Sequence, residues 1–306
     1  MLGFSLIAPF FIYIGLGFLA QKVHEKSDGA QDWLDSFVFY LAMPALLFQT
    51  ISRAGPPSVD VMLTLSVTSV VTTALFMLTA ALGRRHDQDA DKAVSGLLGS
   101  YSNIGYMGPV LSVQLFGEAA GLPAAMIFCS EIIVLLSLWM LATAGASAEG
   151  LLLALVKAVR HPFVLTVAFA LVLTAFGISF AGPIDVAMIG LSNAAAPCAL
   201  FSLGLTLARQ KGLSVSPGLT IGLVGKLVLH PVLMALCLWP VLHHQPIWLG
   251  TAILMASLPP AANVYVLAQS AGRSARLAAS GVMYGTLASA ITVPLVILFL
   301  TQFLIR

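Results

Sequence analysis

Two stretches of the chain place an asparagine and prolines inside otherwise apolar runs. Residues 101–109 read YSNIGYMGP, and residues 257–265 read SLPPAANVY. Proline lacks a backbone N–H and clashes with the preceding turn, so a helix through either stretch is interrupted. A helix that restarts after such a break presents unpaired N–H groups equivalent to about half a positive charge. Asn103 and Asn263 add amide donors, so we predict binding of a small anion such as a carboxylate, although the loop carbonyls could instead coordinate a cation.

The candidate binding residues all lie in these two stretches. They are Asn103, Gly105, Tyr106, Pro109, Pro259, Pro260, Asn263 and Tyr265. We expect Pro260 to occupy the first position of its restarted helix, where the missing N–H is not needed.

Two charged residues stand near the middle of long apolar runs, Glu131 and Lys226. A charge at the centre of a bilayer costs at least about 2.5 to 3.5 kcal/mol, so it marks a function or a pair. Lys226 can neutralise substrate charge, pair with Glu131, change its protonation during transport, or snorkel along its own stem. Glu131 is either a proton or counter-charge group or a structural partner of a broken helix. His230, one turn beyond Lys226, either shares a polar seam with it or packs as a hydrogen-bonded residue.

Patterns for catalysis and for metal binding are missing from the sequence. No HExxH, GxSxG or phosphate-loop pattern occurs, and Cys129, Cys198 and Cys237 stand far apart in apolar segments. The sequence therefore predicts a protein that is not an enzyme and has no metal and no cofactor, with coupling to H⁺ or Na⁺ left open.

Composition places the whole chain in a lipid bilayer. Of its 306 residues 59% are hydrophobic and only 8% are charged, whereas a soluble domain carries about 25% charged residues. The net charge of +2 comes without a basic stripe, which argues against a nucleic-acid partner. The expected partners are lipid and a small solute.

Ten apolar runs reach the length of about 20 residues that a membrane-spanning helix needs. They cover residues 2–20, 33–52, 61–82, 93–115, 120–143, 161–179, 184–207, 217–241, 247–269 and 277–303. All Lys and Arg except Arg53, Lys226 and Arg306 fall in loops that follow odd-numbered spans. Because cytoplasmic loops are enriched in these residues, we predict a multi-pass protein with both termini on the non-cytoplasmic side.

A shift of 153 residues aligns the two halves of the chain. It places Pro9 on Pro162, Asp32 on Asp185 and Pro44 on Pro197. Residues 1–148 and 149–306 would then be two five-helix repeats, and an odd number of spans makes the second repeat inverted. Inverted repeats are characteristic of secondary transporters, whose sites lie near the bilayer midplane at broken helices. The two breaks fall in the fourth and ninth spans, which are equivalent, and this favours a binding site over two incidental kinks.

Several segments resemble the auxin efflux carrier family, which includes plant auxin exporters and bacterial carriers assigned to malate or malonate. They are FVFYLAMPALLFQTIS, SNIGYMGPVL, HPFVLTVAFALVLTAFGI, PCALFSLGLTLA, KLVLHP and ASLPPAANVYVLAQ, and the resemblance covers essentially the whole chain. It implies ten helices with crossing broken helices 4 and 9, an elevator-type mechanism and a homodimer. Spans 1, 2, 6 and 7 would form the scaffold and spans 3–5 and 8–10 the transport domain. Asn103, Pro109, Pro259, Pro260 and Asn263 would match the crossover positions.

We therefore expect an all-α secondary transporter that moves small organic anions, such as malate, malonate or auxin-like acids, across the bacterial inner membrane. Transport could be uniport driven by the membrane potential, or cotransport with H⁺ or Na⁺. A sodium-coupled bile-acid-like symporter is the alternative, since it shares the crossing-helix architecture. An intramembrane hydrolase is disfavoured because no nucleophile and base are paired, and a receptor or channel because an inverted repeat suits alternating access.

Overall fold

The fold consists of packed helices. A computed structural model of the chain describes residues 2–23, 28–53, 61–87, 91–144, 159–178, 180–210 and 215–304, with single residues at 152, 156 and 213. Within these ranges the regular structure is helical apart from one isolated β-bridge. The helical segments long and apolar enough to cross a membrane are Ser5–Val23, Gly29–Arg53, Val61–His86, Glu118–Thr143, Pro183–Arg209, Pro217–Leu242 and Ala275–Phe303. The chain is therefore a multi-pass α-helical membrane protein.

The first half of the chain carries the helices that correspond to the first five predicted spans. They are α1 (Leu2–Val23), α2 (Asp28–Phe37), the π-helical turn η1 (Val38–Ala42), α3 (Met43–Arg53), α4 (Val61–His86), α5 (Lys92–Ser100), α6 (Gly108–Phe116), the 3₁₀ turn η2 (Glu118–Ala120) and α7 (Gly121–Ala144). The second predicted span is one continuous helical path, because α2, η1 and α3 follow each other without a gap.

The second half repeats this pattern of long and interrupted helices. It contains α9 (Pro162–Ala175), α10 (Pro183–Arg209), α11 (Pro217–Val224), the π-helical turn η3 (Gly225–Leu229), α12 (His230–Leu242), α13 (Pro246–Ser257), α14 (Asn263–Ser270) and α15 (Ala275–Phe303). Proline opens α9, α10, α11 and α13, a position where its fixed φ suits the helix and its missing N–H is not needed.

Helical residues occupy most of every predicted span, while ten crossings of the membrane stay a prediction. The sixth span is the poorest match, since α9 ends at Ala175 and Gly177 turns the chain with φ +66°. The predicted boundary between the halves, at residues 148 and 149, lies outside the described residues, as does Arg306.

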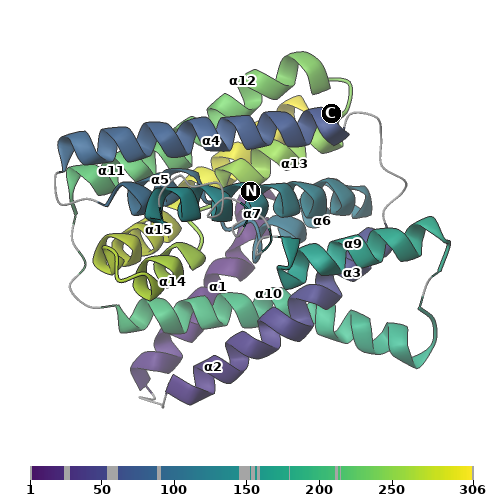
Figure 1. Cartoon of the computed structure of the whole chain (residues 1–306). Coiled ribbons are helices and arrows are strands. Elements are labelled where there is room, and N and C mark those ends of the chain that lie inside the picture. Colours follow the sequence, from purple (N-terminus) through teal and green to yellow (C-terminus); the bar gives the residue numbers. More distant parts are fainter. Residues whose placement is uncertain are drawn as a thin grey trace.

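The helices fall into two groups in space. Figure 1 shows α2, α3, α9 and α10 in its lower part and α4, α11, α12 and α13 in its upper part. We call α1, α2, α3, α9 and α10, with η1, the lower group, and the remaining helices the upper group. Contacts within each group, such as those of α1 with α10 and of α4 with α5, are more extensive than contacts between the groups.

Glycines allow α1 and α10 to approach at backbone distance. A Cβ atom on Gly17 would overlap the carbonyl oxygen of Phe201, and one on Gly204 would overlap the carbonyl oxygen of Ile14. Such small residues are the usual means of close helix packing in a bilayer, where lipid removes the hydrophobic drive for association. The lower group therefore contains a tightly packed α1–α10 pair.

Candidate functional site

Each of the two predicted breaks is a real interruption between two short helices. The fourth predicted span consists of α5 and α6, separated by residues 101–107, and the ninth consists of α13 and α14, separated by residues 258–262. Pro109 is the second residue of α6, whereas Pro259 and Pro260 lie between α13 and α14. In Figure 1, α5 and α14 lie on the left of the molecule and α6 and α13 on the right. The starts of α6 and α14 both lie at the breaks, toward the middle of the molecule.

The two breaks cross and hydrogen-bond to each other. The Asn103 N–H donates to the Pro259 carbonyl at 2.8 Å, and the Ala261 N–H donates to the Tyr101 carbonyl at 3.0 Å. Between these bonds, Ser102 and Pro260 form an antiparallel β-bridge. A backbone group freed from a helix inside a bilayer must find another partner. Here each break supplies partners for the other, so the crossing is held by its own backbone.

The expectation that Pro260 begins the restarted helix is wrong, because α14 begins at Asn263. The two hydrogen bonds beside the β-bridge are donated by the N–H groups of Asn103 and Ala261, so residue 260 needs no N–H of its own. Proline fits there because its lack of a donor has no cost in this pairing.

The asparagine side chains at the crossing differ in their partners. The Asn263 Nδ2 donates to the Tyr101 hydroxyl at 3.3 Å. The Asn103 Nδ2 and the Ser102 Oγ are buried and have no hydrogen-bond partner among the described residues. Leaving a buried polar group unsatisfied costs about 1 to 3 kcal/mol. An unpaired amide next to the break is therefore a group that a bound ligand can satisfy.

Two cavities, each of about 360 Å³, flank the crossing between the lower and upper groups. The polar residues of the first, which we call the Asp35 cavity, are Asp35, Ser36, Tyr40, Tyr106, Ser202, Thr206 and Asn263. Those of the second, the Arg53 cavity, are Tyr13, Gln49, Thr50, Arg53, Gln114, Glu118, Ser192 and Asn193. Both are within the size range of small-molecule sites, about 300 to 1,000 Å³.

Three of the eight predicted site residues line the two cavities. Tyr106 and Asn263 line the Asp35 cavity, and Pro109 lines the Arg53 cavity. The first cavity therefore reaches the start of α14 and the second reaches the start of α6. The other five predicted residues line neither cavity: Asn103, Gly105, Pro259, Pro260 and Tyr265. Gly105 lies against the Phe128 ring, and Tyr265 packs against the apolar core.

The walls that α2, α3 and α10 contribute were not predicted as part of the site. Asp35 accepts a hydrogen bond from the Ser202 hydroxyl. Gln49 of α3 donates to Asp185 of α10 at 2.9 Å. The sequence pattern did not indicate that these polar residues face the breaks.

Lys226 and Glu131 lie in one buried polar network, away from both cavities. The side chains of Lys226, His230 and Glu131 are 0%, 2% and 4% exposed. The Lys226 Nζ and the His230 Nδ1 are 3.0 Å apart, the His230 Nε2 lies 3.3 Å from the Thr72 hydroxyl, and that hydroxyl donates to Glu131 at 2.9 Å. The network joins η3, α12, α4 and α7, and Lys226 does not snorkel.

The Lys226 ammonium is aimed at one of the breaks. It donates to the Ala256 carbonyl in the last turn of α13. In a continuous helix that carbonyl would accept the N–H of residue 260, which proline lacks. A cation also suits the negative end of a helix dipole. Lys226 therefore caps the interrupted helix, and Glu131 is the acidic group at the other end of the same network.

A multi-pass helical protein whose two interrupted helices cross between polar cavities has the features of a membrane transporter. The family described as "Membrane transport protein" matches residues 2–297. A protein of Rhizobium meliloti (strain 1021) named "Putative malonate transporter" is 40% identical over 94% of this chain and 93% of its own length. "Uncharacterized transporter YfdV" of Escherichia coli (strain K12) is 26% identical over 94% of this chain and 95% of its own. The chain belongs to this family of transporters, the auxin efflux carrier family that its motifs predicted, and is not an enzyme.

Proposed function

We propose that the protein carries small dicarboxylates of the malonate class across the bacterial inner membrane, and binds them at the crossing. The observation that carries the proposal is the hydrogen-bonded crossing of the two breaks, with the start of α14 and Asn263 at the Asp35 cavity, the start of α6 at the Arg53 cavity, and the unsatisfied amide of Asn103 in the break itself. Helix N-termini and amide donors bind a carboxylate without burying a full positive charge. The name of the Rhizobium meliloti relative supports malonate as the first substrate to test.

Charges at the cavity walls differ in a way that fits passage of an anion. The walls of the Arg53 cavity include one arginine, Arg53, and one carboxylate, Glu118, whereas the charged residue of the Asp35 cavity is Asp35, which accepts a hydrogen bond from Ser202. An anion entering past Arg53 would be attracted, and an anion held at the crossing would contact amides and N–H groups. Lys226 acts behind this surface, through the carbonyl of Ala256.

Alternating access by an elevator movement agrees with the division into two groups. The lower group comprises the helices of predicted spans 1, 2, 6 and 7, and the upper group those of spans 3–5 and 8–10. Both broken helices belong to the upper group, and each cavity has walls from both groups. A movement of the upper group against the lower group would open one cavity and close the other around the same crossing.

A five-plus-five inverted repeat is part of the proposal. The Ser202–Asp35 and Gln49–Asp185 hydrogen bonds join α10 to opposite ends of the α2–α3 path. The 153-residue shift places Gln49 on Ser202 and Asp32, one turn from Asp35, on Asp185. Each bond therefore has a counterpart with the two halves exchanged, as a pseudo-two-fold axis requires.

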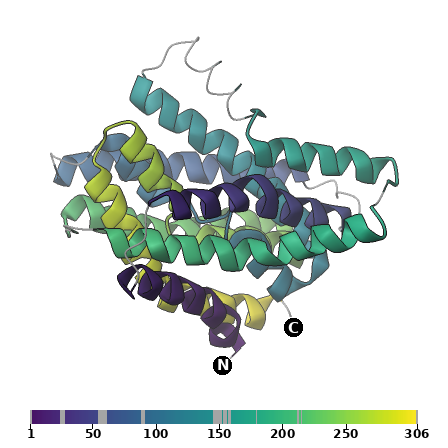
Figure 2. The same cartoon turned by 90° about the horizontal axis from the view of Figure 1, so that it is seen from below.

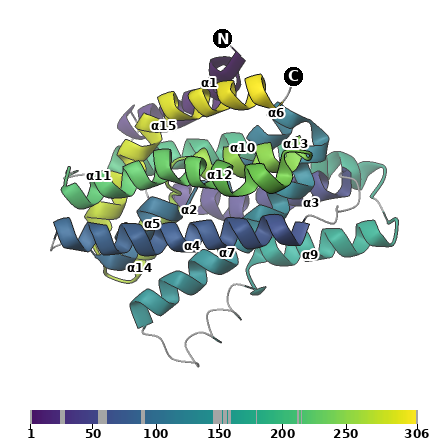
Figure 3. The same ribbon diagram turned by 90° about the horizontal axis from the view of Figure 1, so that it is seen from above.

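Both termini would lie on the non-cytoplasmic side. The start of α1 and the end of α15 lie near each other in Figures 2 and 3, and the two helices contact each other. An even number of spans places both ends on one side, whereas an odd number would separate them. A homodimer formed through the lower group, as the family resemblance implies, completes the proposed arrangement.

The alternative function differs from the proposed one in whether transport is coupled to Na⁺. A sodium-coupled bile-acid-like symporter would require Na⁺ for uptake, whereas an anion uniporter would respond to the membrane potential alone, and an H⁺ symporter to the pH gradient. Proteoliposomes with imposed Na⁺, H⁺ or K⁺-diffusion gradients separate the three.

Uptake of radiolabelled malonate by proteoliposomes tests the proposal. Asn103→Ala and Asn263→Ala should each weaken the apparent affinity about tenfold to a hundredfold, because a hydrogen bond to a charged group contributes about 1.5 to 3 kcal/mol. Gln302→Ala, which removes an exposed amide near the end of α15, serves as the control and should transport normally. Wild-type kinetics in both asparagine variants would rule out the crossing as the binding site.

A further inference from the structure

The turn between α14 and α15 holds the backbone of Arg273 in a defined conformation. The Arg273 N–H donates to the Ala268 carbonyl at 2.8 Å and the Gly272 N–H donates to the Gln269 carbonyl at 3.1 Å, with Gly272 at φ +63°. This is the Schellman pattern, which ends a helix with a left-handed residue, usually glycine. Because α15 begins at Ala275, Arg273 is held in a short, well-defined reversal.

Asp91 uses its two carboxylate oxygens for different purposes. Its Oδ1 accepts the N–H groups of Ala93 and Val94 at 2.9 and 3.1 Å, so it is the N-cap of α5. Its Oδ2 accepts the Arg273 Nη1 at 2.8 Å. The negative charge at the start of α5 is favourable to that helix on its own account, and the second oxygen links it to the α14–α15 turn.

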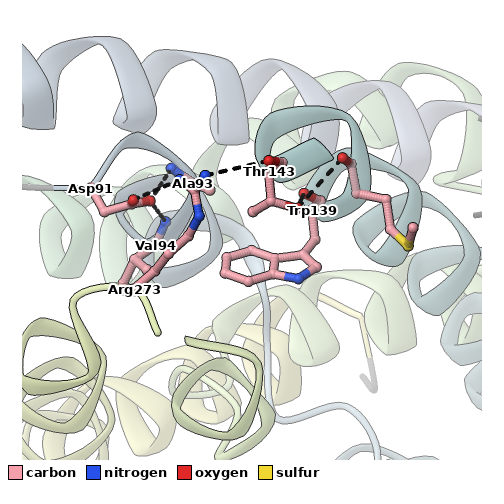
Figure 4. Close-up of polar contacts among 7 residues, drawn as sticks. Asp91, Ala93, Val94, Trp139, Thr143 and Arg273 are labelled. Carbon is pink, nitrogen blue, oxygen red and sulfur yellow. Dashed lines mark hydrogen bonds and ion pairs between the residues drawn. The ribbon is translucent and has the colours of Figure 1, made fainter. Parts of the chain in front are cut away.

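Arg273 also reaches a third helix. Its Nη2 donates to the Thr143 carbonyl at 3.3 Å, in the last turn of α7. Figure 4 shows the guanidinium between Asp91 and Thr143, with Trp139 below the Thr143 side chain. A cation at the C-terminal end of α7 is favourable to the helix dipole there. One side chain thus joins the start of α5, the end of α7 and the end of α14, and we call these contacts the Arg273 clamp.

The clamp lies at the far end of the two half-helices that meet in the crossing. At the crossing, α5 and α14 are joined by the Ala261–Tyr101 backbone bond and the Asn263–Tyr101 side-chain bond. At their other ends they are joined by Arg273 and Asp91. Because α5 and α14 are joined to each other at both ends, they cannot tilt independently. With eight residues, α14 is too short to be stable on its own, so it depends on such ties.

We propose that Arg273 is a positioning residue for substrate binding, which it affects by holding α14 against α5 and α7 so that Asn263 stays in place beside Tyr101. This inference rests on the proposed binding of a carboxylate at the crossing. The arginine acts through α14 and does not contact the substrate. Released from the clamp, α14 would open more often and present Asn263 in the binding orientation for less of the time.

Hydrogen exchange and transport kinetics together test the clamp. In purified Arg273→Gln without substrate, amide exchange of residues 263–270 should accelerate about twofold to fivefold, the factor expected for loss of a partly exposed ion pair. The apparent KM for malonate in proteoliposomes should rise by a similar factor, with the maximal rate per folded protein unchanged. A merely structural role would lower the amount of folded protein and leave KM as it is.

Three further variants test whether Arg273 and Asp91 act as a pair. Asp91→Asn keeps an N-cap residue but removes the charge, so it should match Arg273→Gln, and the double variant should be no worse than either single one. Arg273→Lys keeps the charge but cannot hold both acceptors in a fork, so its KM should be intermediate. Lys92→Gln removes an exposed charge beside Asp91 and should behave as wild type.

Wild-type exchange of residues 263–270 in Arg273→Gln would overturn the inference, and so would effects of the two single variants that simply add. Failure of the wild-type protein to carry malonate would instead overturn the proposed function. The exchange measurement needs no substrate and still decides whether the clamp holds α14.

Discussion

Replacing Lys226 by methionine should destabilise the protein severely, and removing Glu131 as well should restore much of the loss. Methionine has a similar length and no charge, so Lys226→Met removes the ammonium with little change in volume. Lys226 contacts the Ala256 carbonyl and the His230 Nδ1 directly, and reaches Glu131 only through His230 and Thr72. In the variant the Ala256 carbonyl has no donor in the gap left by Pro260, and Glu131 is left as a buried charge without its counter-charge.

The expected magnitude follows from these two losses. Lys226 and Glu131 are joined through His230 and Thr72 and are not in direct contact, so losing the counter-charge costs less than the ~3 to 5 kcal/mol of a broken buried ion pair. An unpaired buried carbonyl costs about 1 to 3 kcal/mol. Because the two share one network they will not add fully, and about 4 kcal/mol is a reasonable expectation. A folded protein has only about 5 to 15 kcal/mol in total, so the single variant should be close to unfolding.

The assay is the fraction of monodisperse protein that survives heating in detergent, compared for wild type, Lys226→Met, Glu131→Gln and the double variant. The double variant should survive markedly better than Lys226→Met, since no uncompensated charge remains, but below wild type because the Ala256 carbonyl is still unpaired. If Lys226→Met is as stable as wild type, or if the double variant is worse than both single variants, the reasoning about a balanced network is refuted.

Two other perturbations test the packing and the route of the anion. Gly17→Val places side-chain atoms where the Phe201 carbonyl lies. It should lower the stability by about 1 to 3 kcal/mol, near the upper end because backbone cannot move aside easily. The control Gly15→Val has nothing within 4 Å of its Cβ position and should be nearly neutral in the same heating assay. Arg53→Gln should raise the apparent KM for malonate about twofold to tenfold at low ionic strength. The increase should be smaller in high salt, where the field of a cavity-wall charge is screened. The same increase in KM over wild type at both salt concentrations would contradict a role of Arg53 in attracting the anion.

The helices and the two breaks could be predicted because they depend on local sequence. Runs of apolar residues define the helices, and proline interrupts a helix wherever it stands in the middle of one. How the breaks meet depends on residues far apart in the chain. Asn103 pairs with Pro259 through backbone atoms, which every residue type has, so no residue pattern indicates that pairing.

The same reason explains the polar contacts that the sequence did not reveal. Lys226 was expected to face the substrate, Glu131 or lipid, and its bond to the Ala256 carbonyl again involves a backbone atom. Asp91 stands where a helix begins and is a typical N-cap residue, but its partner Arg273 is 182 residues away. From charge and spacing, Lys226, Asp91 and Arg273 could each be identified as unusual. Only the fold shows which group each of them bonds to.

The bilayer explains why so few groups at the crossing are left without partners. In water, each interrupted helix could leave its end groups to the solvent, but in lipid every such group carries a cost. The N–H groups of Asn103 and Ala261 are satisfied by the opposite break, and the Ala256 carbonyl is satisfied by Lys226. Among the described residues of the breaks, the side chains of Asn103 and Ser102 are the buried polar groups that keep an unsatisfied atom. A ligand that bonds to Asn103 therefore removes a cost that the empty protein bears. We accordingly expect a true substrate to raise the thermal stability of the wild-type protein, and to do so far less in Asn103→Ala, where that cost is already gone.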